Sequence, residues 1–306
     1  MTTPQAPSGR GIALSISASL LFSLLPAYVT QLRPLDGLGI FAWRILCTLP
    51  GVLLIVLLTG KRQAFADSWQ RMWRQPSLLA AVAGMAALMG VQLWLFLWAP
   101  LHGQVMAVSM GYFLSPLVMV LVGRLLYGER LYRLQAFAVG LAMLGVLHEL
   151  WLTRAIAWPT LLVVLGYPPY FVLRRKSGLD PVCGFALEMA LMFPVALAML
   201  LRLGPAGWGV LDEARFWWLL PGLGILSSIA LLCNIAASHL LPMGLWGLLG
   251  YVEPALLFVL AITVLGEPLG AAGLLTYGPI WGAIILVAIH TLRQQRKLAL
   301  STRTSP

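Results

Sequence analysis

Apolar runs of about 20 residues follow one another along most of this chain, with only short polar connections between them. A helix needs about 20 such residues to cross the roughly 30 Å hydrocarbon core of a bilayer. Only 10% of the residues are charged, whereas soluble domains carry about 25%. The pattern therefore predicts an all-α polytopic membrane protein, because a soluble fold would leave too much apolar surface in water.

Ten apolar segments are long enough to be transmembrane helices. They cover residues 11–32, 37–59, 77–99, 103–126, 134–152, 155–173, 181–203, 216–238, 243–265 and 271–291. The connections between them are short, so we expect no separate soluble domain.

Lysine and arginine are unevenly distributed between the connections. With the N-terminus inside, 15 of the 20 lie on the inner side and 4 on the outer side, and such an excess marks the cytoplasmic face. We therefore expect both termini in the cytoplasm. The net charge of +10 then reflects topology and attraction to anionic headgroups, and we expect no nucleic-acid partner.

A sequence unit occurs twice, at residues 109–133 and 248–269. In each copy, a proline (Pro116 or Pro254) lies 12 residues before a Gly-Glu pair, and the copies are about 138 residues apart. This duplication predicts two homologous halves of five helices each, residues 1–152 and 153–306.

Five spans per half is an odd number, so the second half must enter the membrane from the opposite side. This is the inverted-repeat plan of secondary transporters. The segment AWRILCTLP (42–50) aligns with ALEMALMFP (186–194), which pairs Arg44 with Glu188. Each would lie roughly 10 Å from its own membrane face, on opposite sides of the midplane, so we expect no direct salt bridge between them.

The longest inner connection is KRQAFADSWQRMWRQP (61–76). Its aromatic residues recur at helical spacing among basic residues, a pattern typical of a helix lying in the membrane interface. A docking site for a partner is the alternative.

Charged residues inside spans are the first candidates for a functional site. A charge near the bilayer centre costs about 2.5–3.5 kcal/mol on insertion scales, and such residues usually face a cavity. Arg44 is a candidate ligand for an anionic solute group, Glu188 its counterpart, and Glu253 a candidate proton carrier. Pinning of neighbouring helices is the alternative role.

Uncharged polar and aromatic residues complete the predicted cavity, between spans two, three, four, seven, eight and nine. We expect an outer part, a central part and an inner part. The full set is Arg44 and Gln92 (outer), Tyr112, Ser115 and Glu253 (centre), Glu188 and Asn234 (inner), with Tyr251 as an aromatic wall. Helix bridging and aromatic packing are the structural alternatives for the uncharged members.

Glu129 and Glu267 each stand at the start of a following apolar run. Unpaired amide groups at a helix start favour a carboxylate, so we interpret both as structural caps.

No sequence pattern indicates enzyme chemistry, a metal or another cofactor. H-E-x-x-H and P-loop motifs are absent, the four histidines are scattered, and the three cysteines lie in apolar spans. Two alternatives to transport are left open. They are a receptor that binds a ligand without moving it, and an intramembrane enzyme in which Ser109 or Ser115 would need His102 or His239 within reach.

Several segments resemble one family. Gly111–Arg130 reads G-Y-F-x-x-P-L-V…G-E-R, LFLWAPLHGQ precedes it, and LLCNIAASHLLP precedes Tyr251. Together with the Arg44 and Glu188 segments, they resemble the RarD branch of the EamA transporters, in the drug/metabolite transporter superfamily. The resemblance covers essentially the whole chain.

That resemblance implies a ten-helix permease of two inverted repeats in a bacterial inner membrane. We therefore expect a secondary transporter that works by alternating access. Because the predicted walls are aromatic with few charges, we expect a small amphipathic metabolite or drug-like solute, of which an amino-acid-like solute is one candidate. Protons are the candidate coupling ion, and the remaining partner is the bilayer itself.

Overall fold

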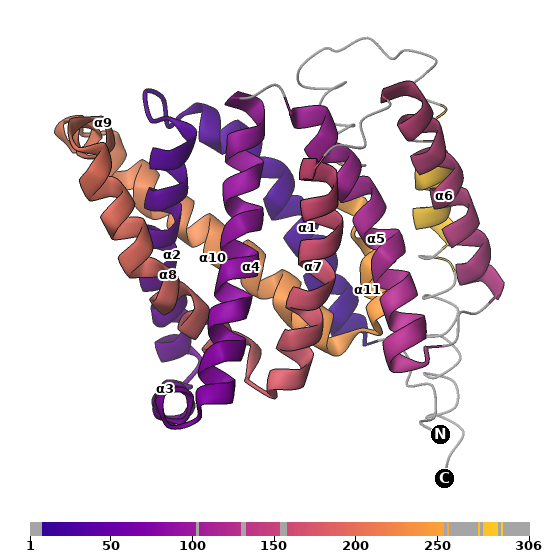
Figure 1. Cartoon of the computed structure of the whole chain (residues 1–306), viewed down its shortest axis with the longest axis horizontal. Helices are drawn as coiled ribbons and strands as arrows, with labels where there is room; N and C mark the ends of the chain where they lie inside the picture. Colours follow the sequence, from indigo (N-terminus) through magenta and orange to yellow (C-terminus); the bar gives the residue numbers. More distant parts are fainter. Residues whose placement is uncertain are drawn as a thin grey trace.

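The computed structural model describes residues 8–101, 104–129, 133–153, 158–253, 256, 275, 278–286 and 289, and these residues contain helices and turns but no strand. Figure 1 shows a bundle of helices that run side by side. The labelled helices are α1 (Gly9–Thr30), α2 (Gly37–Leu58), α3 (Arg62–Arg74), α4 (Pro76–Leu101), α5 (Val105–Tyr127), α6 (Arg133–Thr153), α7 (Trp158–Ser177), α8 (Pro181–Leu203), α9 (Pro205–Trp208), η1 (Gly209–Asp212), α10 (Phe216–Leu240) and α11 (Met243–Leu249).

Each of the first eight predicted spans contains a helix whose ends lie within four residues of the predicted ones. Six of these helices are long and apolar enough to cross a membrane, namely α1, α2, α4, α6, α8 and α10. The ninth span begins with α11, and most of the tenth lies outside the described residues. The fold is therefore that of an all-helical, multi-pass membrane protein.

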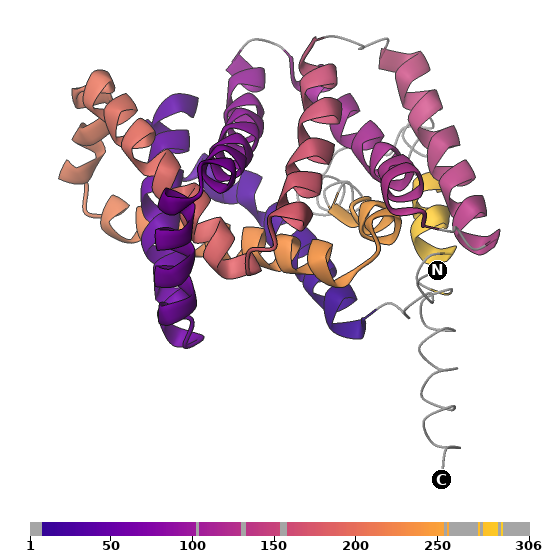
Figure 2. The same ribbon diagram turned by 60° about the horizontal axis from the view of Figure 1, so that its bottom comes forward.

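Helix α3 fills the predicted interfacial segment. It lies across the ends of α2 and α4 instead of continuing either one (Figures 1 and 2). Met72 is buried, whereas Trp69 and Trp73 are 37% and 56% exposed, and their rings pack edge to face at 6.0 Å. Met72 thus packs against the bundle, whereas the two tryptophans lie on the outer face of α3.

Two membrane helices begin with the same cap, 144 residues apart. Asp36 Oδ1 accepts a hydrogen bond from the Gly39 amide (2.7 Å) at the start of α2. Asp180 Oδ1 accepts one from the Val182 amide (2.9 Å) at the start of α8. Each carboxylate satisfies amide groups that have no partner within their helix.

Asp180 also joins two connections at one end of the bundle. Its Oδ2 lies 2.5 Å from Lys61 Nζ, between α2 and α3. Burial alone would raise the pKa of Asp180, but the hydrogen bonds from Lys61 and the helix amides lower it overall. The carboxylate is therefore charged at neutral pH, and the ion pair persists.

The helices pack as pairs from distant parts of the chain. Helix α1 packs on α10, α2 on α8, α4 on α7, and α5 on both α7 and α11. In Figure 1, α4, α7 and α5 lie in front of α10, α1 and α11. The bundle thus has two layers, and the space between them holds the site described below.

Glycines allow two of these pairs to approach closely. A Cβ on Gly224 would lie 2.2 Å from the Cys47 carbonyl oxygen, between α10 and α2. A Cβ on Gly247 would lie 3.0 Å from the Pro116 carbonyl oxygen, between α11 and α5. Small residues at such contacts are how membrane helices gain packing energy, because lipid supplies no hydrophobic drive for their association.

We expect Gly224→Ala to destabilise the protein by about 1–3 kcal/mol, because its new methyl group meets backbone that cannot move aside. Gly140→Ala is the matched control, since a Cβ there has no neighbour within 4 Å. The measurement is thermal unfolding in detergent. Equal melting temperatures for the two variants would contradict the packing described.

Candidate functional site

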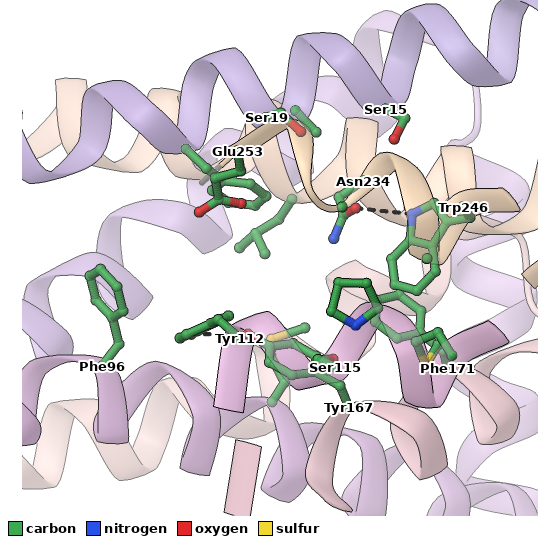
Figure 3. Close-up of a pocket in the computed structure, with 18 of the residues that line it drawn as sticks. Ser15, Ser19, Phe96, Tyr112, Ser115, Tyr167, Phe171, Asn234, Trp246 and Glu253 are labelled. Atoms are coloured by element: carbon green, nitrogen blue, oxygen red, sulfur yellow. Dashed lines mark hydrogen bonds between the residues drawn. The ribbon is translucent and has the colours of Figure 1, made fainter. Parts of the chain in front are cut away.

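A cavity of about 150 Å³ lies between the two layers of the bundle. In Figure 3, Ser15, Ser19, Asn234, Trp246 and Glu253 lie along one wall, from α1, α10, α11 and the residues after it. Phe96, Tyr112, Ser115, Tyr167 and Phe171 form the opposite wall, from α4, α5 and α7. The cavity therefore lies where segments far apart in the sequence face one another.

Arg44 on α2 brings a positive charge to this cavity. Its side chain is only 6% exposed, and its Nε donates a hydrogen bond of 3.0 Å to Ser227 Oγ on α10. That hydrogen bond holds the guanidinium in place through its Nε atom. Glu253 lines the same cavity, so a guanidinium and a carboxyl group share the space.

Aromatic side chains supply much of the remaining lining. The hydroxyl oxygens of Tyr112 and Tyr167 are 3.3 Å apart, which joins α5 to α7. The Phe171 and Trp246 rings are 4.1 Å apart at their centres. Trp246 Nε1 donates to Asn234 Oδ1 at 3.2 Å (Figure 3). The site thus combines a guanidinium and a carboxyl group with aromatic walls.

Five of the eight residues proposed from sequence line the cavity: Arg44, Tyr112, Ser115, Asn234 and Glu253. The expected walls need a correction. Helices α1 and α7 contribute lining residues that were not expected, and α8 contributes none. A sequence signal existed for α1, because Ser15, Ser19 and Phe22 recur at helical spacing.

Gln92 and Tyr251 lie outside the cavity, contrary to expectation. Gln92 is 2% exposed and donates from Nε2 to the Leu162 carbonyl at 2.8 Å. Tyr251 is fully buried and donates from its hydroxyl to the Phe113 carbonyl at 2.8 Å. Both side chains reach a backbone carbonyl on another helix, so in this structure they bridge helices.

Glu188 also lies away from the cavity. Its carboxylate pairs with Arg174, and it accepts a hydrogen bond from the Tyr170 hydroxyl at 3.1 Å. Glu188 and Arg174 are 0% and 3% exposed. The sixth predicted span ends at residue 173, so Arg174 was counted among the basic residues of the inner connections. The structure instead places it on the inward face of α7, one turn after Tyr170.

Glu129 caps a helix far along the chain. Its two carboxylate oxygens accept hydrogen bonds from the amides of Met243 (2.6 Å) and Gly244 (2.8 Å) at the start of α11. The sequence predicted a cap on the helix that follows Glu129, whereas the capped amides among the described residues belong to α11, which packs against the end of α5. Glu267 lies outside the described residues.

We expect Arg174→Ala to destabilise the protein by about 3–5 kcal/mol, because it leaves Glu188 charged and unpaired in the interior. Arg124→Ala, an exposed arginine on α5, should cost far less. The double variant Arg174→Met with Glu188→Leu should regain most of the loss, since both charges are removed together. Thermal unfolding in detergent measures all three. A small loss for Arg174→Ala would contradict the buried pair.

Comparison with known proteins gives consistent matches. Residues 9–148 match the EamA-like transporter family. The "Chloramphenicol-sensitive protein RarD" of Pseudomonas aeruginosa is 49% identical over 292 residues, which cover 95% of this chain and 98% of that protein. An uncharacterised transporter of Pasteurella multocida, PM1281, is 41% identical over 85% of this chain and 89% of its own length.

The fold is shared with a solved structure. A crystal structure with 18% sequence identity matches 92% of this chain and 98% of its own, with a TM-score of 0.68. At this identity the likeness concerns the fold alone. The relatives from Pasteurella multocida and Haemophilus influenzae are named as transporters and not as enzymes.

Proposed function

Because the chain belongs to the RarD-type EamA family of the drug/metabolite transporter superfamily, we propose that it is a secondary transporter of a small amphipathic solute. The solute site is the cavity that Arg44 and Glu253 share. The membrane is the bacterial inner membrane, with both termini in the cytoplasm, and the distribution of lysine and arginine supports this orientation.

The helix pairing supports two inverted halves of five spans. If the two halves are exchanged, each span takes the place of the span five places along, so that α1 replaces α7 and α10 replaces α4. The α1–α10 pair then becomes the α7–α4 pair, whereas the α2–α8 and α5–α11 pairs map onto themselves. The α1–α10 and α4–α7 contacts are both present, as this symmetry requires. The repeated aspartate caps before α2 and α8 agree with it. Inverted halves give alternating access to one central site by rocking against each other.

The cavity's contents support an amino-acid-like solute. Its volume of about 150 Å³ is below the roughly 300–1,000 Å³ typical of small-molecule pockets, which favours a metabolite over a larger drug. Arg44 suits a carboxylate because a guanidinium can bind both of its oxygens. Glu253 suits an ammonium group, and the aromatic walls suit an apolar side chain. No salt bridge joins Arg44 to Glu253, so both are available to a solute.

Glu253 is also the proposed proton carrier. Intramembrane carboxylates that face a cavity serve as proton relays in transporters. A solute ammonium and a proton would then compete for the same carboxylate, which couples their movements in opposite directions.

The first experiment identifies a solute and then tests the two charges. Free amino acids and chloramphenicol, included because of the relative's name, are screened for those that raise the melting temperature of the purified protein. We expect Arg44→Ala and Glu253→Gln each to weaken binding of the identified solute about 10–100-fold, which is the effect of losing a hydrogen bond to a charged group.

Uptake into liposomes is measured with the same variants. Glu253→Gln should also abolish any stimulation of transport by a pH gradient. Arg124→Ala and Glu213→Gln are controls, because both residues are exposed. Binding and transport at unchanged rates in both cavity variants would remove these residues from the mechanism.

A further inference from the structure

One end of the bundle carries a polar cluster that the solute site does not use. Its central members are Glu129, after α5, and Arg175, in the last turn of α7. Arg175 Nη1 lies 3.9 Å from Glu129 Oε1, and the two side chains are 18% and 19% exposed. Both face the turn between α10 and α11, which lies beside the lower ends of α5 and α7 in Figure 1.

Glu129 and Arg175 bind opposite sides of that turn. The Glu129 carboxylate accepts hydrogen bonds from the first two amides of α11. The Arg175 guanidinium donates to the Ser238 carbonyl at 2.7 Å and to the Leu241 carbonyl, at the end of α10. A carboxylate at a helix start and a cation at a helix end are the favourable arrangement at each terminus. Charged side chains therefore stabilise the turn on both sides, Arg175 at the end of α10 and Glu129 at the start of α11.

This cluster lies one helical turn beyond the floor of the cavity. Phe171 and Trp246 form the cavity lining nearest to this end, and their rings are 4.1 Å apart. Arg175 is four residues after Phe171 on α7, and the Met243 amide bound by Glu129 is three residues before Trp246 on α11. The aromatic pair and the charged cluster thus follow one another between the cavity and this end of the bundle.

We propose that Glu129 and Arg175 form the closure of the transport route at the end of the bundle where α1 begins and α10 ends. This inference rests on the proposed function, because only a transporter must open there. Both are positioning residues. They hold α11, and with it Trp246, against α5 and α7, and the contacts of Glu129 with the α10–α11 turn and with Arg175 must break when this end opens.

The contact between the proposed halves explains why Glu129 is the decisive member. Glu129 belongs to the first half, whereas α10, α11 and Arg175 all belong to the second. Rocking of one half against the other at this end would therefore break the Glu129 hydrogen bonds first. A charge-assisted hydrogen bond is roughly twice as strong as a neutral one, so neutralising Glu129 should favour the open state.

The test measures access to the cavity from each membrane side without any solute. Ser15 is replaced by cysteine, because it lines the cavity and is the lining residue of α1 nearest to this end. The native cysteines are first replaced by alanine: Cys47, Cys183 and Cys233. A membrane-impermeant thiol reagent is then applied to inside-out and right-side-out vesicles.

We expect Glu129→Gln to increase the rate of labelling from the cytoplasmic side about fivefold and to leave or lower the rate from the other side. Glutamine keeps an acceptor oxygen, so the protein should still fold. Arg175→Lys is the second variant. It keeps the positive charge but loses the fork that spans two carbonyls, and it should act in the same direction.

Glu213→Gln is the matched control. Glu213 pairs with Arg215 at 2.7 Å, but both belong to the same half, and they precede the start of α10, whereas the cluster lies at the end of that helix. Its labelling rate should equal that of the starting protein. The closure is overturned by unchanged labelling in both Glu129→Gln and Arg175→Lys, by faster labelling from the opposite side, or by equal acceleration in the control. Failure of solute uptake by the wild-type protein would instead refute the proposed function, whatever the labelling shows.

Discussion

Hydrocarbon offers no hydrogen bonds, so a polar group that a membrane helix turns away from water must find its partner within the protein. This constraint decides which helices of this bundle meet. The Tyr28 hydroxyl donates to the Leu219 carbonyl at 2.7 Å, which joins α1 to α10. Ser228 donates to the Thr48 carbonyl at 3.1 Å, which joins α10 to α2. Contacts of this kind, together with the close approach at glycines, connect residues as far apart as 191 positions.

The same constraint separates structural polar residues from candidate functional ones. Gln92, Tyr251 and Glu188 find partners on neighbouring helices and leave the cavity to others. Arg44 and Glu253 instead reach the cavity, where a solute or water can approach them. We therefore propose these two residues, and not the buried helix-bridging ones, as the groups that a solute meets.

The spans were predictable because their length, and the charged residues between them, are visible in the sequence. The direction of each polar residue around its helix was not predictable, because a membrane helix is apolar both on its lipid face and on its core face. Tyr167 was therefore missed, and Gln92 was placed in the cavity although it points at the Leu162 carbonyl. Arg174 was counted with an inner connection because the predicted span ended at residue 173, whereas α7 continues to Ser177 and Arg174 is buried.

Long-range partners were equally hidden from the sequence. The Gly-Glu pair at residues 128–129 predicted a helix cap, yet the capped amides lie 114 and 115 residues further along the chain. Only the packing of α11 on α5 brings them together. The position of a cap is thus a property of the bundle, and it connects the end of one proposed half to the cavity wall of the other.

The central claim is that one cavity between two opposed halves opens in turn to each side of the membrane. Ser115 lies in the lining of that cavity on α5. The most direct measurement is the reaction of a Ser115→Cys protein, otherwise free of cysteine, with an impermeant thiol reagent added to one side at a time. The account predicts reaction from either side, with a bound solute protecting against both. Reaction from only one side under all conditions, or reaction that no transported solute slows, would contradict it.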